Sequence, residues 1–178
     1  RQLMTLEFQW VSQIFAISNI RNLSMRIYYL IAFFILIIDQ ATKFWILYVL
    51  QLEKLRSFDV FSPYLTFQFA WNKGINFGLF SSNEAFVKWV LIFITLLICF
   101  FITLYTFKVL TTNFERTMAG FVLGGAAGNV FDRFFHGAVV DFLNMSCCGI
   151  VNRYSFNVAD VAIFLGIFAI IFFSNKKV

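Results

Sequence analysis

The sequence predicts a membrane protein of the all-α class, a bundle of four transmembrane helices with a small β-rich cradle on the outer, periplasmic side. Hydrophobic residues make up 61% of the 178 residues and charged residues only 13%, against roughly 45–50% and roughly 25% in soluble domains. The apolar residues gather in four stretches, each to be compared with the ~20 residues that a helix needs to cross ~30 Å of hydrocarbon. This composition excludes soluble globular, disordered, collagen-like and disulfide-rich proteins.

The four stretches cover about residues 27–50, 86–107, 116–131 and 156–173. The second is the most uniform, because it is free of charge from Trp89 to Phe107. The first contains Asp39 and Lys43, and the fourth carries Asp160 near its beginning. The third is rich in glycine and alanine, and small residues allow neighbouring membrane helices to approach closely. We therefore expect the third helix to pack tightly within the bundle.

The segment between the first two spans has the pattern of a strand. Residues 64–71 alternate, and they are bounded by Pro63 and by the turn-forming residues 72–74. For residues 57–80 we therefore expect short antiparallel β-structure on the outer membrane surface, followed by a helical or looped return.

Residues 1–24 are interpreted as an N-terminal extension, and residues 25–178 as a single membrane domain. Apolar residues between Leu3 and Ile17 lie at helical spacing, which predicts an amphipathic helix at the membrane interface. An alternative of equal weight is that Met25 is the functional start. A secretory signal peptide is disfavoured, because no small-residue cleavage site follows an apolar run.

The net charge of +5 is interpreted as a topology signal. Seven Lys and Arg residues lie in the N-terminal segment, the 108–116 connection and the C-terminal tail, and five lie in the longer connections 51–85 and 132–155. Basic residues accumulate on the cytoplasmic side of membranes, so both termini are expected there. Basic residues do not form a stripe interleaved with aromatics, so no nucleic-acid partner is expected. One His and three Cys without a C-x-x-C pair make a metal site improbable.

Aspartates in apolar surroundings need an explanation, because an Asp at the centre of a membrane helix costs about 2.5 to 3.5 kcal/mol. Asp39 lies four residues before Lys43, the spacing of an ion pair on one helix face, and Asp132 is adjacent to Arg133. For Asp39 a structural role is the stronger interpretation.

Asp141 and Asp160 differ from these, because neither has a Lys or Arg within four residues. The chain order brings both to the outer side, where their carboxyls can approach each other. Two carboxyls in a low-dielectric pocket cannot both ionise, so one keeps a proton while the other stays anionic. Such a pair suits peptide hydrolysis, in which the anion activates water and the neutral acid supports the oxyanion and protonates the leaving nitrogen.

Two alternatives to a peptidase remain open at the level of these patterns. An ion-coupled carrier also uses paired aspartates, there as a proton relay. A purely structural network of polar residues could instead hold the bundle together. The sequence contains neither G-x-S-x-G nor H-E-x-x-H, so the common serine and zinc hydrolase mechanisms are disfavoured.

Four blocks of the sequence resemble lipoprotein signal peptidase, also called signal peptidase II, the bacterial inner-membrane aspartic protease. They stand in the family's order and cover nearly everything after Met25. The blocks are Asp39-Gln-Ala-Thr-Lys-Phe-Trp45, Asn72-Lys-Gly-Ile-Asn-Phe-Gly78, Gly124-Gly-Ala-Ala-Gly-Asn-Val-Phe-Asp-Arg133 continued by Gly137-Ala-Val-Val-Asp-Phe142, and Phe156-Asn-Val-Ala-Asp160.

The resemblance implies an aspartic endopeptidase without a metal or cofactor, whose catalytic dyad is Asp141 and Asp160. It implies substrates that are prolipoproteins, cut just before a diacylglyceryl-modified Cys, and an enzyme that acts in the lipid of the bacterial inner membrane. We expect a monomer. The residues implied to line or support the site are Asn72, Gly74, Asn129, Arg133, Asn157, Asp39, Lys43 and Asp132.

Some residues depart from the family's pattern. Asn76 and Gly78 stand where many members have Ala and Ser, which leaves the lining of the substrate groove open. His136 and the Cys147-Cys148 pair match no motif. We interpret His136 as an interfacial polar residue and the cysteines as free thiols.

Overall fold

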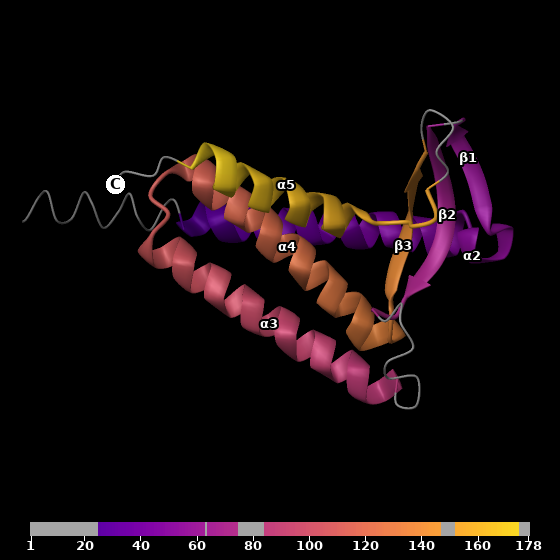
Figure 1. Ribbon diagram of the computed structural model, residues 1–178, viewed down its shortest axis with the longest axis horizontal. Helices are drawn as coiled ribbons and strands as arrows, with labels where there is room; N and C mark the ends of the chain where they lie inside the picture. The colour runs from indigo at the N-terminus through magenta and orange to yellow at the C-terminus, as the bar shows by residue number, and fades with distance from the viewer. Residues whose placement is uncertain (1–24, 63, 75–83, 147–151, 175–178) are drawn as a thin grey trace, which may run out of the picture.

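The computed structural model describes residues 25–62, 64–74, 84–146 and 152–174. In this part of the chain, four long helices lie lengthwise in a bundle, and a three-stranded sheet covers one end of it (Figure 1). The predictions for residues 1–24, for Asn76 and Gly78, and for Cys147 and Cys148 fall outside the described residues.

Each predicted apolar stretch corresponds to a helix. The first helix covers Met25–Val49, and its last five residues form the π-helix η1, Trp45–Val49. The helix α3 covers Glu84–Lys108, α4 covers Asn113–His136, and α5 covers Val158–Phe173. The first helix, α3 and α5 each begin and end within about two residues of the predicted span, whereas α4 extends well beyond residues 116–131 at both ends.

Local signals explain the length of α4. The Thr112 side chain caps its beginning by accepting a hydrogen bond from the Glu115 backbone N–H, and the Glu115 carboxylate accepts one from the Thr112 N–H. At the other end, Gly137 adopts φ +80°, which favours glycine, and donates its N–H to Arg133 O at 3.1 Å. The helix therefore continues past the charged Asp132, whose side chain finds partners inside the bundle.

Two of the described helices, Met25–Val49 and Ala85–Lys108, are long and apolar enough to cross a membrane by length and composition. The helix α5 is equally apolar in character but shorter, with 16 residues. Large side chains on these helices face outwards, among them Phe93 and Phe164, each 67% exposed. Such an apolar outer surface is expected where helices face lipid rather than water.

The helix α4 packs closely against two neighbours through glycine. A Cβ on Gly124 would collide with the carbonyl oxygen of Ala32 in the first helix, and a Cβ on Gly125 would collide with that of Ala159 in α5. Gly128 leaves no room for a side chain beside the Asp39 carboxylate. The prediction that the small residues allow close packing of this helix is confirmed.

The sheet is antiparallel with strand order β1-β2-β3. Strand β1 covers Ser57–Phe61, β2 covers Leu65–Asn72 and β3 covers Val139–Met145, and the short helix α2, Leu52–Leu55, precedes β1. The strand predicted at residues 64–71 is confirmed as β2. Strand β3 was not predicted, because its short apolar sequence does not alternate and cannot be distinguished from a buried helical segment by periodicity.

A small core joins the sheet to the end of the first helix. Ile46 and Leu52 pack there against Phe69 of β2 and against Val140 and Phe142 of β3. Asp141, between the last two, consequently points to the other face of the sheet. This core holds β3 against the end of the first helix.

Candidate active site

Asp141 and Asp160 come from two elements that meet where the sheet joins the bundle. Asp141 lies in the middle of β3 and is paired with Ala70 of β2, and its side chain is buried. Asp160 lies in the first turn of α5 and is partly buried. The structure therefore brings two carboxylates from distant positions in the sequence to one region.

Asn157, which caps α5, contacts both aspartates. Its Nδ2 donates to Asp141 Oδ1 at 2.7 Å. Its Oδ1 accepts from the Asp160 backbone N–H at 2.9 Å, and its own backbone N–H donates to Asp160 Oδ2 at 3.2 Å. The capping box that starts the helix is thus also the link between the two carboxylates.

Two further asparagines complete the set of amide donors. Asn129 of α4 donates its Nδ2 to Asp160 Oδ1 at 2.9 Å, and Asn72 at the end of β2 donates its Nδ2 to Asp141 Oδ2 at 3.0 Å. All four carboxylate oxygens of the pair therefore accept a hydrogen bond from a neutral N–H group. This is an environment that holds negative charge without a direct ion pair.

Burial raises the pKa of Asp141 to about 6. The negative charge of Asp160 raises this pKa further, whereas the hydrogen bonds from Asn72 and Asn157 lower it. A carboxyl with such a pKa keeps its proton to a higher pH than an ordinary aspartic acid does. The two aspartates thus interact electrostatically, as a pair that shares one proton requires.

Arg133 of α4 contributes positive charge to the same region. Its guanidinium interacts electrostatically with Asp160 and Asp141, and its Nη1 donates to Asn129 O at 3.3 Å. Its buried Nε has no hydrogen-bond partner among the described residues. Gly74 lies beside it, since a Cβ at that glycine would sit 3.9 Å from Arg133 Nη2.

A second group of buried charges lies behind Asn129. Lys43 Nζ is 2.8 Å from Asp39 Oδ2 and 2.9 Å from Asp132 Oδ2, and all three side chains are at most 3% exposed. The predicted pair of Asp39 with Lys43 is confirmed. Asp132 forms its ion pair with Lys43 of the first helix rather than with its neighbour Arg133, because residues 132 and 133 point to different sides of α4.

This charge cluster of Asp39, Lys43 and Asp132 connects the elements that carry the site. Asp39 Oδ1 accepts from the Ala159 N–H in the first turn of α5 at 3.0 Å. Asp132 Oδ2 accepts from the Val140 N–H of β3 at 3.1 Å. The cluster therefore holds the start of α5, which carries Asp160, and the strand that carries Asp141.

Sequence reasoning missed Gln40 as a member of this cluster. Its Nε2 donates to Asp132 Oδ1 at 2.9 Å and to Asp39 Oδ2 at 3.1 Å. The only signal for it was a polar residue inside an apolar span.

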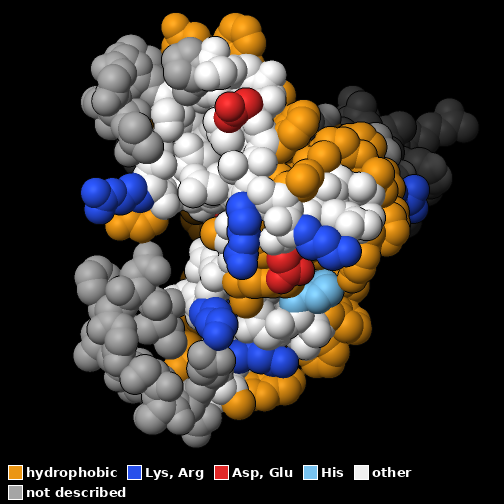
Figure 2. Space-filling model, turned by 90° about the vertical axis from the view of Figure 1, so that its right-hand side faces the viewer, with side chains coloured by type: hydrophobic (Ala, Val, Ile, Leu, Met, Phe, Trp, Pro, Cys, Tyr) orange, Lys and Arg blue, Asp and Glu red, His pale blue; other side chains and the backbone are white. Residues whose placement is uncertain are grey.

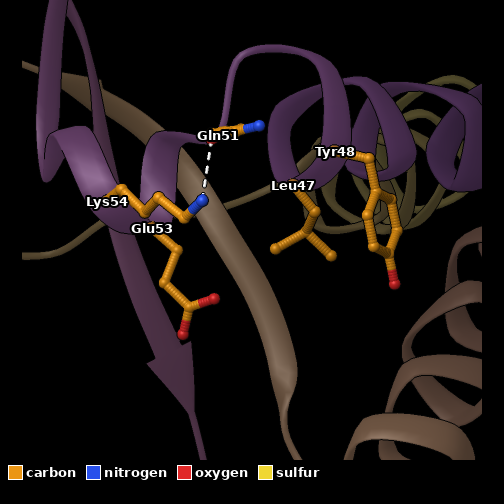
Figure 3. A pocket seen from close by; sticks show the side chains of 5 residues that line it. All are labelled: Leu47, Tyr48, Gln51, Glu53 and Lys54. Carbon is orange, nitrogen blue, oxygen red and sulfur yellow. Dashed lines mark hydrogen bonds between the residues drawn. The ribbon is translucent and has the colours of Figure 1, made fainter.

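Two pockets lie along the end of the first helix. One is lined by Leu47, Tyr48, Gln51, Glu53 and Lys54, and Lys54 Nζ donates across it to Gln51 Oε1 at 3.0 Å (Figure 3). The other extends from Leu47 and Tyr48 to the charge cluster and to His136. Neither is lined by the two candidate catalytic aspartates.

His136 packs its ring against Trp71, with ring centroids 5.8 Å apart. The Trp71 Nε1 donates to Glu53 Oε1 at 3.0 Å. These contacts join the end of α4 to the sheet and to α2. Among the described residues, no group of three or more His, Cys, Asp or Glu side chains is placed to hold a metal ion.

The face at the sheet end carries Lys and Arg side chains, whereas hydrophobic side chains cover the flank beside it (Figure 2). Lys54, Arg56 and Lys73, which belong to α2 and to the ends of strands, are exposed. A charged end next to an apolar flank is the pattern expected where a membrane protein passes from lipid into water.

Comparisons with known proteins agree with this geometry. A family model described as "Signal peptidase (SPase) II" matches residues 31–176. A protein of Pelagibacter ubique (strain HTCC1062) named lipoprotein signal peptidase is 36% identical over 165 residues, covering 89% of this chain and 95% of its own. A protein of the same name from Beijerinckia indica is 33% identical over 138 residues, covering 78% and 81%.

A solved structure is also similar. It is titled "Bacterial membrane enzyme structure by the in meso method at 1.9 A resolution" and superimposes with a TM-score of 0.72 at 29% identity. The match covers 85% of this chain and 94% of the other. The helices and the sheet described above are therefore shared with a bacterial membrane enzyme.

Proposed function

Because this chain belongs to the signal peptidase II family and is accordingly a protease, we propose that Asp141 and Asp160 form the catalytic dyad that removes signal peptides from diacylglyceryl-modified prolipoproteins. The bond between Asn157 Nδ2 and Asp141 Oδ1, at 2.7 Å, carries this proposal. Asn157 also binds Asp160 through its backbone N–H. One residue thus keeps the two carboxylates of different elements together, as a shared-proton mechanism requires.

The surroundings of the two aspartates support different roles for them. Asp160 is the general base, because it lies in the first turn of α5, where the helix dipole and a backbone N–H favour negative charge. Asp141 is the acid, because its raised pKa keeps a proton available. In this proposal, when the pair holds a single proton, that proton is assigned to Asp141.

The reaction then follows from these roles. Asp160 takes a proton from water as the water oxygen bonds to the scissile carbonyl carbon, and negative charge develops on the carbonyl oxygen. The Asp141 O–H and the Arg133 guanidinium stabilise that oxygen. When the C–N bond breaks, the leaving nitrogen takes the Asp141 proton. The dyad still holds one proton, now on Asp160, so the proton count balances without a cofactor.

The membrane arrangement is part of the same proposal. We infer that all four long helices cross the bacterial inner membrane, with both termini in the cytoplasm. The sheet at the end of the bundle then lies at the outer surface (Figure 1). The dyad, on β3 and in the first turn of α5, then lies just below that surface. A diacylglyceryl group stays in the acyl region with roughly 0.8 kcal/mol per buried CH₂. The substrate's peptide bond therefore arrives at the depth of the dyad already concentrated and oriented.

Replacement of either aspartate tests the mechanism. Asp141→Asn and Asp160→Asn should each reduce cleavage of a lipidated prolipoprotein by at least about 10³-fold, because neither amide can share the proton. The measurement is turnover by purified protein in lipid. Asp59→Asn is the matched control, since Asp59 is an exposed aspartate on β1 that bonds only to Thr66 in the described structure. Substantial turnover by either dyad variant would refute the assignment.

A second experiment tests the substrate. A prolipoprotein with the diacylglyceryl group and the same precursor with an unmodified Cys are each reconstituted with the enzyme. We expect cleavage of the lipidated form only, because the lipid holds the peptide at the membrane boundary. Equal rates would show that lipid recognition is not part of specificity.

A further inference from the structure

The three asparagines around the dyad share one feature: the oxygen of each amide is occupied by a group that can only donate. Asn72 Oδ1 accepts from the Gly74 N–H at 2.8 Å, and Asn157 Oδ1 accepts from the Asp160 N–H at 2.9 Å. Asn129 Oδ1 accepts from Lys43 Nζ at 3.3 Å. An ammonium group and a backbone N–H have no acceptor to offer. Each amide must therefore turn its NH₂ group the other way.

In all three cases the opposite side is a dyad carboxylate, so rotation of an amide by 180° would place an oxygen against an oxygen. For Asn72 and Asn157 the donor that prevents this rotation is backbone. For Asn129 one donor is the side chain of Lys43, from another helix. The Nδ2 of Asn157 is a second donor to the same oxygen, at 3.3 Å. The orientation of Asn129 thus depends on a residue that can be replaced.

We propose that Lys43 is a positioning residue for the reaction, which fixes the amide of Asn129 so that its N–H faces Asp160. This inference rests on the proposed dyad. The N–H stabilises the anionic form of Asp160, the form that takes the proton from water. Lys43 does not touch Asp160 itself, and acts through Asn129.

Lys43 is well suited to this role because three oxygen atoms surround its amine. It donates to Asp39 and to Asn129 and forms an ion pair with Asp132. The Asp39 and Asp132 carboxylates both lie within 2.9 Å of the amine. A charged amine can only donate, so the restraint on the Asn129 amide does not reverse.

The pH dependence of cleavage is the property that reports this role. The charged groups that face Asp160 are Asp141 on β3 and Arg133 on α4, with the Lys43 cluster behind Asn129. Lys43→Met removes one of the two donors to Asn129 Oδ1 and leaves only the bond from Asn157 Nδ2, so the Asn129 N–H is held less firmly towards Asp160. The acidic limb of the pH profile of kcat should therefore move up by about one pH unit, with KM little changed. Lys43→Arg keeps a group that only donates hydrogen bonds. The acidic limb of its pH profile should therefore lie at the same pH as in the parent.

Matched variants separate positioning from stability. Gln40→Met breaks bonds to Asp39 and Asp132 but does not touch Asn129, so it should leave the acidic limb in place. In the Asn129→Leu background, Lys43→Met should move the limb no further. The pair Lys43→Met with Asp132→Asn keeps the formal charge of the cluster unchanged, and it provides the same measurement if Lys43→Met alone does not fold.

The outcomes distinguish this inference from the dyad assignment. If Asp141→Asn or Asp160→Asn retains turnover, the dyad itself is wrong. If both are inactive but the acidic limb of Lys43→Met and of the charge-balanced pair equals that of the parent, the positioning role is overturned. Loss of folding in both would also overturn it, because it would assign Lys43 to stability alone. A limb shift that Lys43→Arg reverses supports it.

Discussion

Two pairs of aspartates lie close together in this protein, and they differ in what surrounds them. Asp39 and Asp132 have an ammonium between them, within 2.9 Å of both. Asp141 and Asp160 accept their hydrogen bonds from neutral amide and backbone N–H groups. A counter-ion in direct contact compensates the negative charge of a carboxylate, whereas neutral donors stabilise that charge without compensating it. The difference teaches that burial alone does not identify a catalytic acid.

The largest expected effect is a loss of stability when an aspartate of the charge cluster is replaced. Asp39→Ala removes the contact with Lys43 and the bond to the Ala159 N–H. We expect the free energy of unfolding to fall by about 3–5 kcal/mol, as for other broken buried ion pairs. The measurement is unfolding in detergent or lipid. Asp59→Ala is the control, because an exposed aspartate should change the stability by less than about 1 kcal/mol.

The pH dependence of stability distinguishes the dyad from that cluster. The pKa of Asp141 in the folded protein is about 6 and therefore above its value of 3.8 in an unfolded chain. The folded state binds this proton more tightly, so the contribution of Asp141 to stability is complete below pH 3.8 and is lost as the pH rises through 6.

The variant Asp141→Asn has no carboxyl at this position, so it is the reference for the pH dependence that Asp141 contributes to stability. Between pH 4 and 7 the stability of the parent should fall relative to Asp141→Asn by up to about 3 kcal/mol. Unfolding of both proteins at a series of pH values measures the difference. A difference that stays constant with pH would contradict the assignment of a titrating Asp141.

The smallest effect concerns Gln40, which bridges the two aspartates of the charge cluster without carrying charge. Gln40→Met should lower the free energy of unfolding by about 1–2 kcal/mol, because carboxylates lose a hydrogen bond but keep Lys43. Cleavage per folded molecule should remain close to that of the parent. A large loss of cleavage without loss of stability would show that the two clusters are not separate in function.

Much of the fold could be predicted from sequence patterns that involve residues close together in the chain. Apolar runs determine where the helices lie, since each residue contributes to hydrophobicity independently of its partners. The alternation over residues 64–71 predicted β2, and the glycines of α4 predicted its close packing. The i to i+4 spacing of Asp39 and Lys43 predicted their ion pair, because both lie on one helix face.

The sequence by itself therefore determined the membrane class, the positions of the helices and, through the resemblance of its motifs, the residues of the candidate site. The tertiary structure alone decided which groups touch. It placed β3 beside β2, gave Asp132 to Lys43 rather than to Arg133, and added Gln40 to the charge cluster. It also turned the three amides towards the dyad. The physical reason is that hydrogen bonds and ion pairs act over a few ångströms in space, between residues that are up to 120 positions apart in the chain.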